Sequence, residues 1–349
     1  MKLKRYSGNP ILSPRDTYWE KMQVRNPAAW YDGEKVVMIY SARSVINTIY
    51  LGLAYSTDGY HFERASDEPW LSPTKEGYEA GTVEDARMVK IEDTYYVTYM
   101  ARAIGKEDFE AGAKATGIPA HEDPEAPTWT QNWRRAGLLT TKDFKTVQRL
   151  GPITSEHVFD ANVILFPEKI GGRFCLLHRP SPYFAAESII ENYPPAERPG
   201  MHICFSDDLK NWVDDQPLAG PRFAWENYKI GGSSQPIRTE QGWLVLYHAV
   251  GGPDPQSAVY RVGVMLLDID DPTRIIARSP EPILEPEEIW EKEGTVPMVV
   301  FPNSAVVIDD TLFVYYGGAD TVTAVATADI SEMIEFVMSH PNTSEDIHQ

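Results

Sequence analysis

Polar residues that suit acid–base chemistry recur at one phase of the sequence, at the head of an apolar run. The five heads are Arg25-Asn26, Glu84-Asp85-Arg87, Asp160-Asn162, Ser233-Ser234-Gln235 and Asn303-Ser304. Successive strand residues point to opposite faces, so we expect only one of Glu84 and Asp85 to face a shared site. Asp85 is the better candidate, because it is in phase with Asn26, Asn162 and Asn303. A carboxyl group there, with aromatic residues nearby, suits protonation of a glycosidic oxygen.

Cationic side chains recur where the second strand of each unit ends. These tails carry Arg43, Arg102, His178-Arg179, His248 and, in the last unit, Asp320. A glycosidase of the usual kind needs a second carboxylate as base or nucleophile, whereas cations and imidazoles bind an anion. In a chain with 32 basic and 51 acidic residues such a group is a local exception. Inorganic phosphate is the small anion that a sugar-cleaving site would use, so the tails favour phosphorolysis.

These positions belong to a two-part unit that occurs five times, with a polar head, an apolar strand, a tight turn and a second apolar strand. The copies begin at Arg25, Glu84, Asp160, Ser233 and Phe301. Asp32-Gly33 and Gly171-Gly172 supply turn residues that tolerate positive φ. A second strand–turn–strand segment follows each copy, from YLGLAYSTDGYHFER in the first to TAVATADISEMIEF in the last. A β-sandwich would not repeat this order five times.

The repeat therefore predicts an all-β fold, a five-bladed β-propeller that forms a single domain over residues 1–349. The innermost strand of each blade borders the central channel, so the heads should converge on one mouth of the channel with the tails beside them. Capping of strand ends by Asn and Asp stays open as an explanation for part of the pattern. An inserted loop at about 103–135 should lie above the mouth as a lid, an acceptor-site wall or an oligomer contact, so a homo-oligomer also stays open.

Composition and charge exclude several classes of protein. Of the 349 residues 42% are hydrophobic and 11% aromatic, which is enough apolar surface for a packed core. The net charge of −19 repels nucleic acid and anionic lipid, so we expect neither as a partner. No apolar run resembles a membrane span or a secretory signal, and we expect a cytoplasmic location. Cys175 and Cys204 are too few for a metal ribbon or a disulfide framework and are expected to be reduced core thiols.

Several segments together resemble glycoside hydrolase family 130, the β-mannoside phosphorylases and related β-mannosidases. The matching segments are RNPAAWYDG, VEDARMVKIEDTYYVTYMAR, NVILFPEKIGGRFCLLHRP, GWLVLYHAV, VYRVGVMLLD, EGTVPMVVFPNSAVV and YYGGAD. The resemblance runs from about Asn9 to about Phe336 and covers all five units. It implies a five-bladed propeller in which phosphate attacks a β-mannoside with inversion. The implied products are α-mannose 1-phosphate and a shortened acceptor, and the reaction needs no metal or organic cofactor.

The resemblance also implies roles for single residues. Asp85 matches the family's acid, which is thought to deliver its proton through a sugar hydroxyl. Asn26 and Asp320 match residues on either side of the mannosyl ring. The further substrate-binding candidates are Arg43, Arg87 and Asn162. The phosphate-binding candidates are Arg102, Arg179, His248 and Tyr260.

One departure from the family pattern keeps hydrolysis open as an alternative. Many of the phosphorylases have Arg or Lys just before the matched asparagine, where this chain has Ala161. A hydrolase at the same site would need a base to activate water, for which Glu291 and Glu293 are the candidates. A carbohydrate-binding propeller without catalysis is a third reading. The sequence does not decide the linkage or the acceptor.

Overall fold

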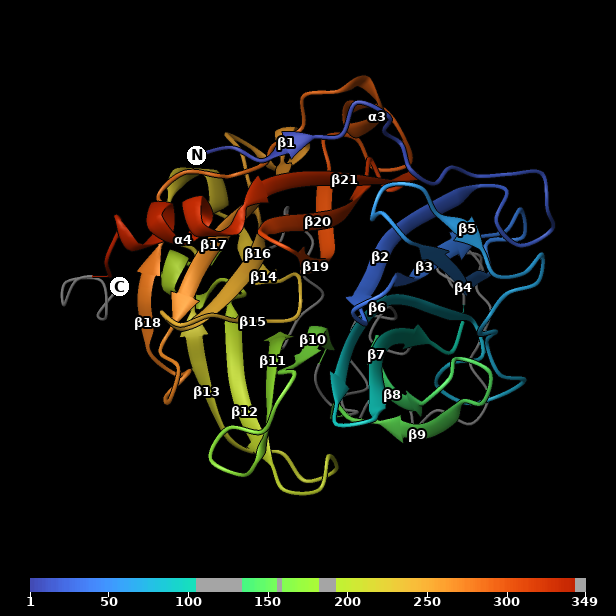
Figure 1. Ribbon diagram of the computed structural model, residues 1–349, viewed down its shortest axis with the longest axis horizontal. Coiled ribbons are helices and arrows are strands. Elements are labelled where there is room, and N and C mark those ends of the chain that lie inside the picture. Colours follow the sequence, from blue (N-terminus) through green and yellow to red (C-terminus); the bar gives the residue numbers. More distant parts are fainter. Residues whose placement is uncertain (105–133, 156–158, 182–192, 343–349) are drawn as a thin grey trace.

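The described strands form five antiparallel blades of four strand positions each, arranged around a central axis (Figure 1). The computed structural model describes residues 1–104, 134–155, 159–181 and 193–342. Most of the predicted insertion at about 103–135 therefore lies outside the described residues. Blade 1 contains β2 (Gln23–Tyr31), β3 (Val36–Arg43), β4 (Ile49–Ser56) and β5 (Glu63–Arg64). Blade 2 contains β6 (Thr82–Ile91), β7 (Thr94–Arg102), β8 (Arg135–Thr141) and β9 (Gln148–Pro152).

The other three blades continue the same order around the ring. Blade 3 contains β10 (Phe159–Leu165), β11 (Phe174–Ser181), β12 (Met201–Ser206) and β13 (Val213–Ala219). Blade 4 contains β14 (Lys229–Gly232), β15 (Ile237–Arg238), β16 (Trp243–Gly251), β17 (Val259–Leu267) and β18 (Ile275–Arg278). Its inner position is split, because β14 and β15 both pair with β16. Blade 5 contains β19 (Val300–Ile308), β20 (Thr311–Gly318), β21 (Val322–Asp329) and β1 (Lys4–Arg5).

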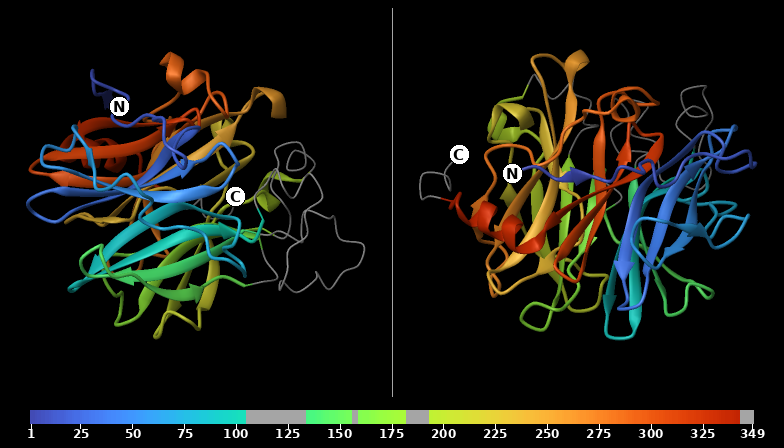
Figure 2. Two further views of the ribbon diagram at one scale, coloured as in Figure 1. Left: turned by 90° about the vertical axis from the view of Figure 1, so that its right-hand side faces the viewer. Right: turned by 45° about the horizontal axis from the view of Figure 1, so that its top comes forward.

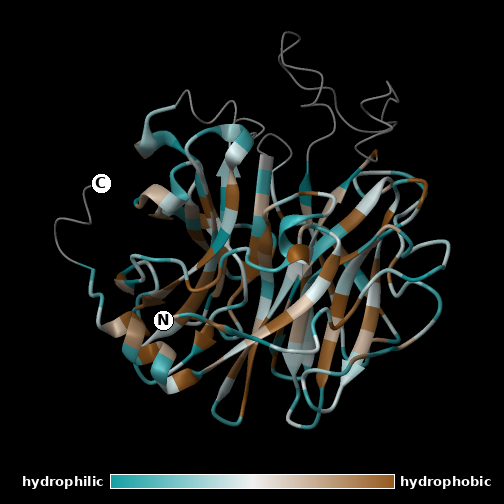
Figure 3. Cartoon of the chain, turned by 90° about the horizontal axis from the view of Figure 1, so that it is seen from above, coloured by the Kyte–Doolittle hydropathy of each residue, from teal (hydrophilic) through white to brown (hydrophobic). Residues whose placement is uncertain are grey.

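The predicted five-bladed β-propeller is confirmed, and its core is divided into layers between successive blades. One layer joins Val37 of blade 1 to Val97 of blade 2, and another joins Met38 of blade 1 to Val325 of blade 5. Three further layers fill the remaining junctions of the ring. Hydrophobic residues (brown) accordingly recur along the strands in Figure 3, and apolar side chains of all five blades are buried in these layers. Cys175 is buried without a disulfide, as predicted.

The last unit differs from its predicted form, because its fourth strand comes from the other end of the chain. β1 pairs with β21 through Lys4↔Thr327 and Arg5↔Ala326, which closes the ring (Figure 2). The segment after β21 forms the helix α4 (Ile330–Met338) instead of a strand. Asp329 caps this helix by accepting a hydrogen bond from the Glu332 N–H. None of the described helices has both the length and the apolar character needed to cross a membrane.

A buried ion pair holds the closing strand in place. Arg5 donates from Nε to Glu291 Oε1 at 2.8 Å and from Nη2 to Oε2 at 2.9 Å, and the Tyr316 hydroxyl donates to Oε1 at 2.9 Å. Glu291 belongs to the short helix α3 (Ile289–Lys292) and its side chain is fully buried. These bonds engage both carboxylate oxygens of Glu291, which disfavours the expected role of Glu291 as the base that activates water. Glu293, the other candidate base, is exposed.

Tyr316 is one of four tyrosines at the same position on the second strand of a blade. The set is Tyr40, Tyr99, Tyr247 and Tyr316. In these four blades the third strand presents a small residue opposite the ring, namely Gly52, Gly137, Gly263 and Ala324. A Cβ at any of the three glycines would overlap the tyrosine ring. Blade 3 breaks this pattern, because His178 faces His202 at the equivalent pair.

We expect Glu291→Gln to destabilise the fold by about 3 kcal/mol, because it leaves the Arg5 guanidinium without its buried countercharge. The measurement is the midpoint of urea unfolding. Lys2→Ala is the matched control, since it removes the exposed Lys2–Glu285 ion pair of the same N-terminal segment, and it should change stability by less than about 1 kcal/mol. Equal shifts for the two variants would contradict a role of Glu291 in closure.

Candidate active site

A β-bulge at the same place in three inner strands aims polar side chains at the channel. The pairing register shifts between Arg25 and Ala28 in β2, between Glu84 and Arg87 in β6, and between Ala161 and Ile164 in β10. The residues in the left-handed conformation at these bulges are Asn26 (φ 53°), Asp85 (φ 55°) and Asn162 (φ 56°). Asn and Asp adopt this conformation more readily than most residues, and bulges redirect side chains near functional sites. The phase predicted for Asn26, Asp85 and Asn162 is therefore present in the structure. Asn303, predicted at the same phase, lies at the register shift between Pro302 and Ser304 in β19 but does not adopt the left-handed conformation.

The bulge also changes the expected orientation of Glu84. Arg25 Nη2 donates to Glu84 Oε2 at 2.9 Å, and Arg25 Nη1 donates to Asp85 Oδ1 at 3.3 Å. Both carboxylates thus reach one guanidinium group, so the expectation that only one of them faces the site is wrong. Strict alternation fails here because the left-handed residue turns the chain between the two side chains. Arg134 completes the group, with Nη2 at 3.6 Å from Glu84 Oε1.

The surroundings of Asp85 favour the ionised form of its carboxyl group. Its Oδ1 accepts a hydrogen bond of 2.7 Å from Asn26 Nδ2, and its backbone N–H donates to Ser41 Oγ at 2.9 Å. Burial alone would raise the pKa of the carboxyl group, but the charges of Arg25 and Arg134 outweigh burial and hold the pKa below its ordinary value. Asp85 must therefore gain a proton before it can act as an acid.

Asp320 faces the same guanidinium group in a different electrostatic state. It follows β20 in the left-handed conformation (φ 52°), and its Oδ2 lies 3.9 Å from Arg25 Nη1. Burial raises the pKa of Asp320 above its ordinary value and outweighs the attraction of Arg25, while the Asp85 carboxylate raises it further. One arginine is thus shared by an ionised carboxylate and by a carboxyl group that retains its proton more readily.

A separate group of cationic and aromatic side chains lies on blades 3 and 4. Arg179 Nη1 is 3.1 Å from His248 Nε2. Arginine can only donate, so Nε2 accepts and the histidine proton sits on Nδ1, which donates to Ser233 Oγ at 3.2 Å. Burial and the nearby positive charges of Arg179, Arg87 and Lys229 keep the pKa of His248 well below its ordinary value, so this imidazole is neutral. The Tyr260 ring lies parallel to it, with centroids 6.4 Å apart.

Arg87 connects the carboxylates to this cationic group. Its Nη1 donates to the Asp85 carbonyl oxygen at 2.7 Å and its Nε donates to the Ser233 carbonyl oxygen at 2.6 Å. Burial lowers the pKa of Arg87 to about 10, with Asp85 opposing the shift and Arg179 adding to it. The Arg87 guanidinium therefore interacts electrostatically with both the carboxylate group around Asp85 and the cationic group around Arg179.

Buried polar atoms in the channel are left for a ligand or solvent. Asn26 Oδ1, Asn162 Oδ1 and Arg87 Nη2 are buried and have no hydrogen-bond partner among the described residues. Gly231 faces His248 across β14 and β16. A Cβ at Gly231 would lie 2.7 Å from Asn162 Oδ1 and 2.9 Å from Arg179 Nη1, so the glycine keeps space open between these groups. Buried polar atoms are rarely left unpaired unless a site uses them.

Arg43 and Arg102 do not occupy the position on their strands that Arg179 occupies in blade 3, although the tails were expected to be equivalent. Arg179 pairs with Ala161, the residue before its bulge, whereas the equivalent partners in blades 1 and 2 are Ser41 and Met100. Arg43 and Arg102 each follow two residues later, which is about 7 Å along a strand. Arg43 Nη2 donates to Asn47 Oδ1 at 2.5 Å within its own hairpin loop, and Arg102 pairs with Thr82 at the end of β7.

Sequence reasoning missed several members of the site. Arg25 was visible as a polar head but received no role, and Arg134 lies at the edge of the insertion, where no repeat signal exists. Lys229 and Gly231 precede the head predicted for blade 4. Their position follows from the split inner strand of that blade, which the repeat pattern does not show.

Comparison with known proteins shows the family to which the chain belongs. A family model described as beta-1,4-mannooligosaccharide phosphorylase matches residues 3–117 and 128–339. The chain is 38% identical to a 1,2-beta-oligomannan phosphorylase of Thermoanaerobacter sp. (strain X514), with 95% of this chain and 99% of the relative covered. It is 36% identical to a beta-1,2-mannobiose phosphorylase of the same organism, with 96% and 99% covered.

A solved structure shows the same relationship. The beta-1,2-mannobiose phosphorylase from Listeria innocua, in complex with beta-1,2-mannobiose, superimposes with a TM-score of 0.77 at 27% identity, covering 97% of this chain and all of that one. The family model spans nearly the whole length, and both relatives exceed 30% identity over their full extent. The chain therefore belongs to glycoside hydrolase family 130.

Proposed function

We propose that this chain cleaves β-mannosides by phosphorolysis, with Asp85 as the acid and with phosphate bound by the cationic group around Arg179 and His248. The observation that carries the proposal is the position of Arg87, which bonds to the backbone at both Asp85 and Ser233. An anion held by the cationic group would therefore lie beside the acid. Relatives with 30–38% identity over most of the chain are named β-mannoside phosphorylases, which supports the same reaction.

The reaction assigns a task to each group of side chains. A phosphate oxygen attacks the anomeric carbon, the bond to the acceptor oxygen breaks, and that oxygen takes a proton that originates on Asp85. Attack from the face opposite the leaving group inverts the configuration and yields α-mannose 1-phosphate. Asn26 and Asp320 would hold the mannosyl ring, since Asn26 is hydrogen-bonded to Asp85 and Asp320 lies 3.9 Å from the Arg25 guanidinium that also contacts Asp85. Tyr260 and Asn162 border the anion.

Phosphate also provides a way to protonate the acid. In the protein without ligands, nearby arginines keep Asp85 ionised. A phosphate bound between Arg87 and Arg179 would offset part of that positive charge and bring negative charge close to Asp85. Both changes raise the pKa of Asp85, so the acid becomes competent when the nucleophile is in place. Water would not produce this effect.

The hydrolytic alternative has less support at this site. Ala161 does lack the cation that many of the family's phosphorylases have before the asparagine, but Arg87 and Lys229 bring additional positive charge to the same group. Arg87 is therefore better assigned to the anion than to the sugar. The suspected base Glu291 is occupied by Arg5 and Tyr316. Phosphorolysis gives the cations Arg179, Arg87 and Lys229 a role, because they would bind the phosphate.

We further propose that the substrate is a β-1,2-linked mannoside. The relatives at 38% and 36% identity are named for β-1,2-linked substrates, whereas a β-1,4-mannooligosaccharide phosphorylase of Ruminococcus albus is 30% identical. Parallel assays with β-1,2-mannobiose and β-1,4-mannobiose, each with phosphate, decide between the two linkages. Release of mannose 1-phosphate at a higher rate from the 1,4-linked sugar would contradict the assignment.

Asp85→Asn should lower turnover by at least ~10²-fold, the usual scale for loss of a positioned acid. Folding should be nearly unaffected, because the amide still accepts a hydrogen bond from Asn26 and the buried Arg25 keeps its ion pair with Glu84. The measurement is mannose 1-phosphate release at saturating phosphate. Asp93→Asn serves as control, since the contacts of Asp93 with Thr94 and Lys142 are exposed. Unchanged turnover in Asp85→Asn would remove this residue from the mechanism.

Arg179→Ala should raise the KM for phosphate by about ten- to a hundredfold, since a charge-assisted bond contributes roughly 1.5 to 3 kcal/mol. The KM for the mannoside should change much less. Arg173→Ala on the same hairpin is the control, because Arg173 forms an exposed pair with Asp214. Mannobiose cleavage at the same rate without phosphate, with free mannose as product, would establish hydrolysis instead.

Gly231→Ala should also weaken phosphate binding, because the added methyl group occupies the space between Asn162 and Arg179. We expect a higher KM for phosphate with little change in the KM for the sugar. Gly220→Ala is the control, because a Cβ at Gly220 meets no atom within 4 Å. Identical phosphate kinetics in the two variants would place the anion elsewhere.

A further inference from the structure

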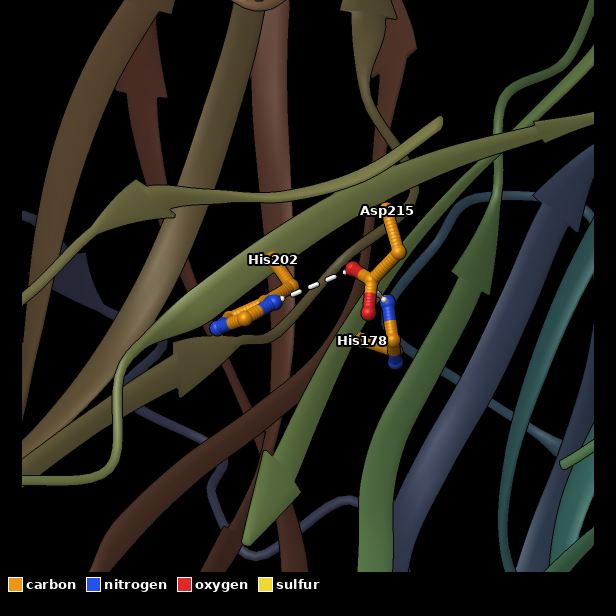
Figure 4. Close-up of side chains that lie close together, drawn as sticks. All are labelled: His178, His202 and Asp215. Atoms are coloured by element: carbon orange, nitrogen blue, oxygen red, sulfur yellow. Dashed lines mark hydrogen bonds and ion pairs between the residues drawn. The ribbon is translucent and has the colours of Figure 1, made fainter. Parts of the chain in front are cut away.

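Three strands of blade 3 each contribute one metal-ligating side chain to a single cluster on the face of the sheet (Figure 4). His178 on β11 pairs directly with His202 on β12, and Asp215 lies on the neighbouring strand β13. Asp215 Oδ1 is 3.1 Å from His178 Nε2 and 3.0 Å from His202 Nδ1. The three ligand atoms all lie within 4.8 Å of one another, so one ion could contact all three with small side-chain movements.

The surrounding contacts orient one histidine for coordination. His178 Nδ1 is 2.8 Å from Asp160 Oδ2. A histidine that ligates a metal commonly gives its other ring N–H to a carboxylate, which fixes the tautomer and makes the ligating nitrogen more basic. Asp160 occupies that position here, and Nε2 is the nitrogen that faces the cluster. The site therefore has both a ligand set and a supporting carboxylate.

The cluster replaces a pair of residues that is alike in the other four blades. Each of the other four blades places a buried tyrosine over glycine or alanine at the equivalent pair. Blade 3 replaces the tyrosine with His178 and the small residue with His202, and adds Asp215 beside them. The side chains are 8%, 26% and 50% exposed respectively, so the cluster opens to solvent on one side and an ion can enter.

We propose that His178 Nε2, His202 Nδ1 and Asp215 Oδ1 bind one divalent transition-metal ion of the Zn²⁺ type. Two imidazoles and one carboxylate are ligands that Zn²⁺ accepts, and three protein ligands leave the fourth tetrahedral position to water. The ligands must offer lone pairs, so binding displaces the protons that His178 Nε2 and His202 Nδ1 donate to Asp215 Oδ1. His178 keeps its proton on Nδ1 and releases the other to solvent, and His202 takes up the tautomer with its proton on Nε2.

The ion would have a structural role next to the anion site. Asp160 Oδ1 accepts hydrogen bonds from the backbone N–H groups of Ala161 at 2.9 Å and Arg179 at 3.2 Å. An ion on His178 would fix the His178–Asp160 pair and, through it, the backbone that carries Arg179. This role rests on the proposed function of Arg179, whereas the binding of the ion does not.

The test is metal binding by the untagged full-length chain after treatment with a chelator. We expect one equivalent of Zn²⁺ in competition with a chromophoric chelator, and Co²⁺ should give the strong visible absorption of a tetrahedral site. His202→Ala and the isosteric Asp215→Asn should each weaken Zn²⁺ binding by at least ~10-fold, the lower end of the effect seen even for outer carboxylates. Circular dichroism checks that both variants are folded.

His61→Ala is the matched control. His61 also contacts an aspartate, with Nδ1 2.7 Å from Asp58 Oδ2, but it has no second histidine beside that pair in the described part of the chain. Its Zn²⁺ affinity should equal that of the unaltered chain. Absence of stoichiometric binding would overturn the proposal, and so would binding that survives both His202→Ala and Asp215→Asn. Neither result would affect the proposed phosphorolysis, which is assayed separately.

Discussion

The left-handed bulge on the inner strands is the constraint on which the site depends. A regular strand would send Glu84 and Asp85 to opposite faces, and Arg25 could not reach both. The bulge places them around one guanidinium group. A non-glycine residue in this conformation costs of order 1 kcal/mol or more, and Asn and Asp bear that cost best. The hydrogen bond from Asn26 to Asp85 connects two such bulges and offsets part of the cost.

The bulge gives two reasons why Asn and Asp recur at the heads of the inner strands. Their backbone tolerance explains why small polar residues recur at the bulge, and their side chains supply the chemistry of the channel. A structural and a functional explanation therefore do not exclude each other at Asn26 or Asn162. The buried amide oxygens of both residues lack partners among the described residues, which a purely structural role would not leave.

The sequence was sufficient for the architecture, because blades repeat and hairpin turns carry strong local signals. It also placed Asp85, Asn26 and Asn162 at one phase. It failed where structure depends on pairing between distant segments. The closure by β1, the pairing of Arg5 with Glu291 and the split inner strand of blade 4 leave no periodic trace. The two-residue offset of Arg43 and Arg102 from Arg179 arises because the hairpin of blade 3 is two residues longer than those of blades 1 and 2, whereas the bulge shifts the register in the same way in all three blades.

Departures from the repeat indicate where the molecule is specialised. Positions with the same kind of residue in most blades contribute to packing, as do the four tyrosines that pack over glycine or alanine. The next residue along each of these strands differs in every blade, and only blades 3 and 4 have cationic or imidazole side chains there, Arg179 and His248. Because those blades are neighbours, the two side chains meet at one junction of the ring. Phosphate needs charge concentrated on one side of the sugar, so fivefold pseudosymmetry must be broken at that junction. The same blade 3 that supplies Arg179 also loses its tyrosine to His178, so two departures from the repeat occur at adjacent residues.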